Sequence, residues 1–155
     1  LHTSDASTSI DRLIEMGVPP YLVSETLIAA LAQRLLRKLC DKCKQPDETV
    51  TKEKLKELTS RLYDFPEEFS LFKPIGCDEC NNFGFRGRTA IYEMLINDWN
   101  LRTAVPIRNF DSSHVRAYLR SKNVRSLRES GLLKALQGIT SLKEVYANTV
   151  EDVYE

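Results

Sequence analysis

The first hydrophobic positions of the chain follow helical spacing. Ile10, Leu13 and Ile14 fall on one face of a helix when they are spaced at three and four residues. Gly17 follows directly, and a glycine just past the last apolar position is typical of a helix end. The pattern therefore predicts a short amphipathic helix that ends before Gly17.

A longer apolar pattern begins after Pro19 and Pro20. Large side chains recur there every four residues, at Val23, Leu27, Leu31, Leu35 and Leu39. Since further apolar residues lie beside this row, the apolar stripe is wide. The spacing predicts one long helix over residues 22–39, largely buried.

The middle of the chain changes character. Residues 44–70 are polar and charged, and we expect one surface helix there, near residues 52–59. Residues 71–76 are typical of a short strand that enters a turn at Gly76, and residues 89–96 combine β-branched and aromatic side chains, as a strand does.

The last third of the chain is predicted to be helical. One apolar face carries Val115, Tyr118 and Leu119, and a second carries Leu132, Leu133, Leu136 and Ile139. The run from Ser141 to Glu144 has the capping-box pattern, in which hydroxyl and carboxylate each accept a backbone N–H of the other residue.

The composition is that of a globular protein. The 155 residues are 42% hydrophobic and 28% charged, which excludes a disordered or collagen-like chain. Lys plus Arg and Asp plus Glu both number 22, so a zero formal charge argues against a dedicated polyanion binder. The longest apolar run is far shorter than the ~20 residues that span a bilayer.

The sharpest chemical signal is a pair of Cys-x-x-Cys motifs, Cys40/Cys43 and Cys77/Cys80. Two residues between thiolates let one tight turn present both sulfurs to a single ion, and two such turns complete a tetrahedral shell that suits Zn²⁺. All four positions are then used by protein, which is typical of a structural site. Iron in the same cage and a redox dithiol are weaker alternatives.

Basic residues flank the cysteines in sequence. They are Arg37, Lys38, Lys42, Lys44, Arg86 and Arg88. They can offset the net negative charge of a metal bound by four thiolates, or they can form an ordinary solvated face. Arg86 and Arg88 are also candidates for pairing with Asp78, Glu79 or Glu93.

Four segments together resemble the type II secretion and type IV pilus assembly ATPases. They are residues 1–6 (LHTSDA), 31–40 (LAQRLLRKLC), 76–89 and 125–142, the last with the motif GITSL. The first is similar to the family's histidine box, and the second and third to the entry and exit of its zinc-binding insert. Ser4 departs from the usual asparagine of the box.

The resemblance implies an α/β fold that is mostly helical in this chain. It implies that residues 1–39 are the C-terminal portion of a RecA-like ATPase core and residues 40–84 a zinc-binding subdomain. Residues 85–97 would return to the core as a strand, and residues 98–155 would form a C-terminal helical subdomain.

The same resemblance implies a motor function. The family assembles as a homo-hexamer at the cytoplasmic face of the bacterial inner membrane, works with an inner-membrane platform protein, and uses ATP and Mg²⁺ to drive pilus or pseudopilus assembly. The zinc subdomain would serve as a lever or docking surface. His2 would lie close to the nucleotide.

The phosphate-binding motif of such a motor does not occur in this sequence. No Gly-x-x-x-x-Gly-Lys-Ser/Thr is present, so the chain alone is expected not to hydrolyse ATP. The alternative is a stand-alone zinc-ribbon protein that binds nucleic acid or a protein partner. Zero net charge counts against nucleic acid.

Overall fold

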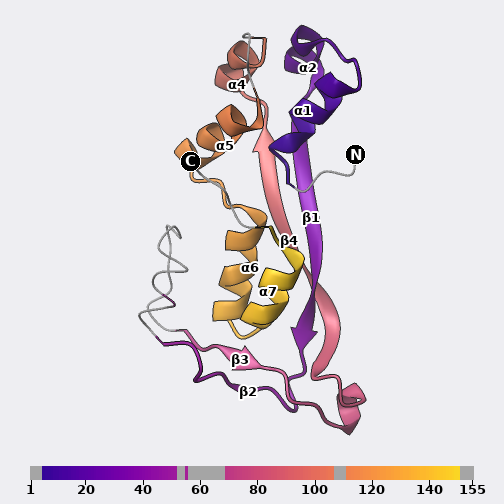
Figure 1. Cartoon of the computed structure of the whole chain (residues 1–155), viewed down its shortest axis with the longest axis vertical. Helices are drawn as coiled ribbons and strands as arrows, with labels where there is room; N and C mark the ends of the chain where they lie inside the picture. The colour runs from indigo at the N-terminus through magenta and orange to yellow at the C-terminus, as the bar shows by residue number, and fades with distance from the viewer. Residues whose placement is uncertain (1–4, 52–54, 56–68, 107–110, 151–155) are drawn as a thin grey trace. The chain divides into compact units, whose positions relative to one another are not determined.

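The computed structural model describes residues 5–51, 55, 69–106 and 111–150 (Figure 1). The described residues up to Gln33 and from Tyr92 to Ser126 form one compact unit, unit 1. Those from Arg34 to Ile91 and from Leu127 to Val150 form a second, unit 2. The predicted surface helix near residues 52–59 falls almost entirely outside the described residues.

Unit 1 is built from four helices around an apolar core. They are α1 (Thr8–Glu15), α2 (Pro20–Thr26), α4 (Trp99–Ala104) and α5 (Ser112–Ser121). The core comprises Ala6, Ile10, Val23, Leu95, Leu101, Val105, Val115 and Leu119. The first predicted helix and its end are confirmed, since Gly17 follows α1 with φ +91°.

The long helix predicted over residues 22–39 is wrong. The chain forms α2 only to Thr26 and then extends as strand β1 (Ala29–Leu39), which pairs with β4 (Phe85–Ile96) in a two-stranded sheet. β4 contains the strand predicted at 89–96 from its residue types and begins four residues before it, at Phe85.

The leucine spacing explains the error. A period of four is also a multiple of two, so Leu31 and Leu35 share one face of a strand as readily as one face of a helix. Leu31 and Leu35 on that face are 58% and 49% exposed, whereas Leu39 at the end of the same face and Leu36 on the other face are buried. The prediction that this segment is largely buried is therefore also wrong.

A buried asparagine organises the turn from α2 into β1. Asn97 donates its side-chain N–H groups to the carbonyls of Ser24 (2.9 Å) and Leu27 (2.7 Å), and its backbone N–H to Ile28 (3.0 Å). These bonds satisfy carbonyls that the end of α2 leaves without a helical partner.

Unit 2 holds two helices and the cysteine turns. The helices are α6 (Leu127–Leu136) and α7 (Leu142–Asn148), which pack on each other. Two short antiparallel strands, β2 (Gln45–Pro46) and β3 (Phe72–Lys73), pair with Gln45 opposite Lys73, and the 3₁₀ turn η1 spans Asp78–Cys80.

Three expectations for this unit are confirmed. β3 lies within the strand predicted over residues 71–76, Gly76 turns with φ +127°, and Leu132, Leu133 and Leu136 lie on α6. Ile139 lies beyond the end of α6, and Val115, Tyr118 and Leu119 lie on α5 of unit 1. None of the helices in the described part of the chain is long and apolar enough to cross a membrane.

Candidate metal centre

Two tight turns present the four cysteines. Cys40 directly follows β1, and the backbone N–H groups of Cys43 and Lys44 bond to its carbonyl at 3.2 and 2.9 Å. In the second turn the carbonyl of Cys77 accepts the N–H groups of Cys80 (3.1 Å) and Asn82 (2.9 Å). Each turn therefore fixes the direction of two thiols.

The sulfur positions fit a tetrahedral metal shell. The Sγ–Sγ distance is 3.9 Å between Cys40 and Cys77, 3.9 Å between Cys43 and Cys80, and 3.8 Å between Cys77 and Cys80. All four sulfurs lie within 4.8 Å of one another, and none forms a disulfide. A tetrahedron with metal–sulfur bonds of ~2.3 Å has edges of about 3.8 Å, so the four cysteines can hold a metal ion.

Backbone donors point at one of the sulfurs. The N–H groups of Cys77 (3.3 Å) and Gly84 (3.2 Å) both donate to Cys80 Sγ. Gly84 has φ +73°, and a Cβ there would lie 2.5 Å from Cβ of Pro74. Only glycine therefore brings this N–H onto the sulfur without strain.

These contacts give two of the thiols different pKa values. Burial opposes ionisation of Cys80, but the two backbone donors outweigh it and the pKa of Cys80 falls to about 7. Burial and then the neighbouring thiols raise the pKa of Cys77 to about 12. A metal that binds all four as thiolates must therefore displace protons.

Several of the flanking cations are paired with carboxylates. Arg86 contacts Glu79 at 3.0 Å, which is one of the pairings predicted from the sequence. Two further pairs were not predicted: Lys44 contacts Asp41 at 2.7 Å, and Arg37 contacts Glu144 at 2.6 Å across more than a hundred residues of sequence.

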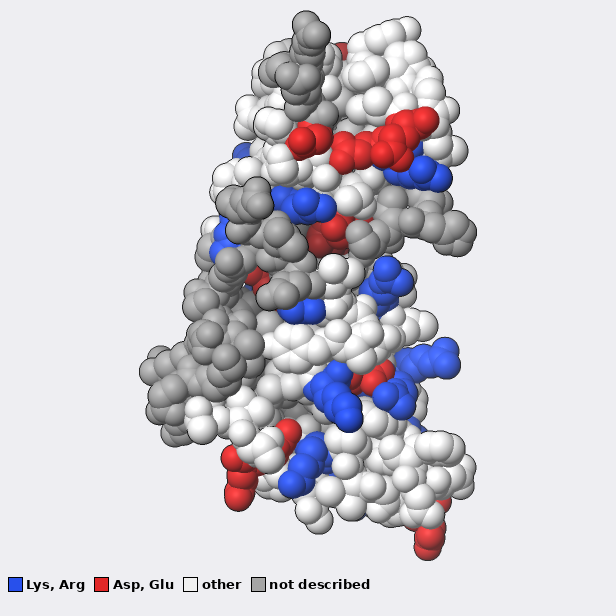
Figure 2. Space-filling model, viewed as in Figure 1, with Lys and Arg blue, Asp and Glu red and all other residues white. Residues whose placement is uncertain are grey.

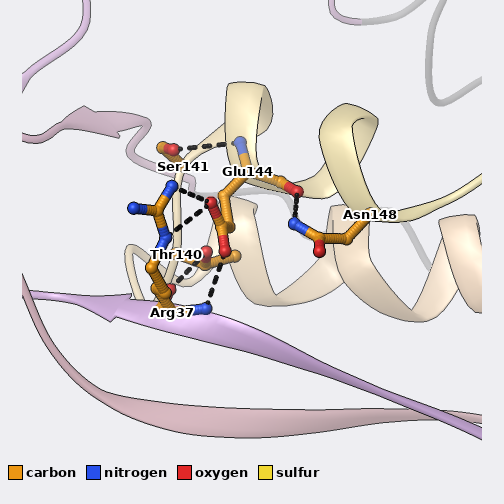
Figure 3. A network of polar contacts seen from close by, with 5 residues as sticks. All are labelled: Arg37, Thr140, Ser141, Glu144 and Asn148. Carbon is orange, nitrogen blue, oxygen red and sulfur yellow. Dashed lines mark hydrogen bonds and ion pairs between the residues drawn. The ribbon is translucent and has the colours of Figure 1, made fainter.

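The Glu144 contacts differ from the predicted capping box (Figure 3). One half is confirmed, since Ser141 Oγ accepts the N–H of Glu144 at 3.2 Å. The carboxylate, however, accepts three bonds from Arg37: the backbone N–H (3.0 Å), Nε (3.0 Å) and Nη2 (2.6 Å). The sequence held no signal for this partner, because a capping box assigns the carboxylate to its own helix.

Of the two histidines, His114 lies within the described residues, and it is not part of the cysteine cluster. His2 lies outside the described residues, so its expected role near a nucleotide stays a prediction. His114 lies in the first turn of α5, where its Nδ1 is 3.0 Å from the carboxylate of Asp111.

The fold and site thus define an α/β chain with four clustered cysteines that can hold a metal ion. The sequence model of the family described as "Type II/IV secretion system protein" matches residues 1–147. The chain therefore belongs to this family of secretion proteins.

Named relatives agree with this assignment. The chain is 42% identical over 155 residues to the type IV pilus assembly ATPase PilB of Thermus thermophilus, covering 97% of this chain and 17% of the relative. It is 40% identical over 154 residues to the type II secretion system ATPase E of Vibrio cholerae, covering 97% of this chain and 29% of the relative. The chain thus spans less than a third of either relative.

Proposed function

We propose that the four cysteines bind one structural Zn²⁺. The observation that carries this proposal is the set of sulfur–sulfur distances of 3.8–3.9 Å, which match the edges of a zinc–thiolate tetrahedron. Four protein ligands leave no position for water, so the ion organises the two turns and does not act on a substrate.

We further propose that the chain works as the C-terminal part of a motor ATPase. It then comprises part of a RecA-like core, the zinc subdomain at 40–84 and the C-terminal helical region. Exposed apolar side chains in unit 1 support this proposal: Leu31, Tyr92, Met94, Ile96 and Trp99. Apolar surface of this kind is usually covered by protein.

The exposure of Trp99 bears on the same point. Trp99 is 77% exposed and does not belong to the core of unit 1. A lone tryptophan of this size is suited to a contact with another part of the ATPase or with a neighbouring subunit.

The whole protein would bind ATP with Mg²⁺ and drive pilus or pseudopilus assembly as a homo-hexamer. It would work in the cytoplasm at the bacterial inner membrane, against an inner-membrane platform protein. The zinc subdomain would serve as a lever or docking surface. This proposal rests on family membership and on the relatives, which are named as pilus assembly and secretion ATPases.

The competing function, a nucleic-acid-binding zinc ribbon, is not favoured. On the face drawn in Figure 2, the basic and acidic side chains of the described residues are interspersed and form no continuous basic stripe. Nucleic-acid binding relies on such a stripe to neutralise phosphates.

Metal content and ATP turnover test these proposals directly. The purified chain is expected to contain one zinc per chain by elemental analysis and to show no ATP turnover, because it lacks the phosphate-binding motif. Iron or no metal would contradict the zinc site. Turnover by the chain alone would contradict its dependence on other parts of the ATPase.

His2 has its own test in the full-length ATPase. A His2→Ala substitution is expected to lower ATP turnover while the protein still forms hexamers, and His114→Ala provides a matched control on α5. Equal turnover in the two variants would contradict the role of His2.

A further inference from the structure

The edge of β1 that faces away from β4 forms hydrogen bonds with the segment between α6 and α7. Cys40 donates its N–H to Gly84 (3.0 Å), next to the first residue of β4. Residues on the opposite edge bond instead to the segment between α6 and α7. Leu39 donates its N–H to the carbonyl of Ile139 (2.9 Å), and the carbonyl of Arg37 accepts the hydroxyl of Thr140 (2.8 Å).

Glu144 completes this closure. Its carboxylate takes the remaining backbone N–H of Arg37 at 3.0 Å and holds the guanidinium of the same residue (Figure 3). The Glu144 side chain is only 4% exposed, and the guanidinium of Arg37 also lies 4.2 Å from the centre of the Phe85 ring. Residues 138–141 together with Glu144 are here called the C-terminal clamp.

The C-terminal clamp also contacts Lys44, which follows the first two cysteines in sequence. The ammonium of Lys44, the residue after Cys43, donates to the carbonyl of Gly138 at 3.1 Å. The same ammonium contacts Asp41 at 2.7 Å and lies 5.1 Å from the centre of the Phe72 ring. The clamp therefore contacts the chain on both sides of the Cys40/Cys43 turn.

The close approach at Gly138 explains why the clamp carries a glycine. Gly138 has φ +68°, and a Cβ there would lie 2.8 Å from the Phe72 ring. A side chain would push β3 away from the clamp and weaken the hydrogen bond from Lys44 to the Gly138 carbonyl.

We propose that the C-terminal clamp positions the Cys40/Cys43 turn, so that retention of the metal depends on Glu144. Arg37 lies three residues before Cys40, and its backbone donor and acceptor are both held by the clamp. With the clamp in place, the first two thiols are fixed before metal binds; without it, ordering them costs part of the binding free energy. This inference rests on the proposed structural metal site.

The coupling is reciprocal. If the clamp strengthens metal binding, the bound metal must strengthen the clamp by the same factor. Metal removal is therefore expected to speed amide exchange at Arg37 and Leu39, whose N–H groups the clamp holds.

Two matched substitutions test the proposal in the complete chain loaded with zinc. Glu144→Gln removes the charge that holds Arg37 and leaves an amide that cannot accept all three of its bonds. Glu79→Gln removes an equal charge between Cys77 and Cys80, where the ion pair with Arg86 is 60–66% exposed. The measurement is the rate of zinc transfer to a chromogenic chelator, with folding checked by circular dichroism.

We expect Glu144→Gln to release zinc about tenfold faster than wild type, the effect typical of residues that orient metal ligands, and Glu79→Gln to stay within about twofold. Thr140→Val, which removes a single bond to Arg37, is expected to give an intermediate rate and serves if Glu144→Gln does not fold. Equal rates in the three variants would overturn the clamp while leaving the metal site intact.

Two other results bear on the proposal. A wild-type chain that holds no metal would overturn the metal site and the coupling together. A wild-type chain that holds zinc but shows unchanged exchange at Arg37 and Leu39 after chelation would overturn the coupling alone.

Discussion

Unit 1 and the cysteine turns of unit 2 are stabilised in different ways. In unit 1, eight buried side chains from the helices, the residues next to them and β4 form one apolar cluster, with Ile10 and Val115 fully buried. In the cysteine turns, residues 40–46 and 71–85, the buried apolar side chains are Cys40, Leu71 and Cys80. Phe83 and Ile75, the large apolar residues nearby, are 73% and 49% exposed.

The difference shows what each region needs in order to fold. Burial of apolar surface in this cluster stabilises unit 1. The turns bury too little for that, and we propose that thiolate–metal bonds and the hydrogen bonds of the C-terminal clamp stabilise them instead. The following changes separate the two sources of stability, in order of decreasing effect.

Loss of one thiol is expected to have the largest effect on metal binding. Cys80→Ser removes the sulfur that accepts two backbone N–H groups, and we expect zinc affinity to fall about a hundredfold or more. Titration with a competing chelator measures the affinity. Amide exchange of α1 and α5 in unit 1 should not change; a large acceleration there would mean that the two regions are not independent.

A cavity in the core of unit 1 is expected to lower stability and to leave zinc affinity unchanged. Ile10 is fully buried, so Ile10→Ala is expected to cost about 2–5 kcal/mol of unfolding free energy through lost burial and the cavity left behind. Denaturant unfolding gives this value. Zinc affinity should match that of wild type, and a parallel loss of zinc would contradict the comparison.

Helix packing in unit 2 can be tested at Gly131. A Cβ there would lie 2.8 Å from Cγ1 of Val145, which is fully buried and stiff, so Gly131→Ala is expected to cost about 1–3 kcal/mol. Denaturant unfolding measures the cost. The double variant Gly131→Ala/Val145→Ala removes the clash and should be less destabilised than the sum of the single changes; simple additivity would show that the clash is absent.

The smallest expected effect is on pH dependence. Burial raises the pKa of Glu144, but its bonds from Arg37 outweigh burial and hold the pKa below its ordinary value of 4.5. A lowered pKa in the folded state stabilises the fold above the unfolded-state value, and this contribution is lost as pH falls through the folded-state value.

Wild type should therefore lose its stability advantage over Glu144→Gln as the pH drops below about 4.5. Denaturant unfolding of the metal-free chains across this range measures the difference. A difference that stays constant with pH would contradict an ionised, paired Glu144.

The sequence predicted the clustering of the four cysteines because local spacing largely determines it. A Cys-x-x-Cys motif brings two sulfurs together within one turn, and the structure brings the two pairs together. The segment at 29–39 could not be assigned in the same way, since leucines at a period of four fit a helix and a strand equally. Its pairing with β4, distant in sequence, decides the outcome.

Long-range polar contacts were also beyond local reasoning. Glu144 has a local role in the capping box, yet its carboxylate binds Arg37. Asn97 likewise stands in no motif, although it holds the turn between α2 and β1. Such partners depend on which elements pack together, and single-sequence patterns carry no information on that.

The most direct test of the account is amide hydrogen exchange of the zinc-loaded chain before and after chelation. We predict faster exchange in the cysteine turns at 40–46 and 71–85 and at Arg37 and Leu39, with α1 and α5 of unit 1 unchanged. Uniform acceleration throughout the chain, or no change in the cysteine turns, would contradict the claim that a metal and the C-terminal clamp together hold this region.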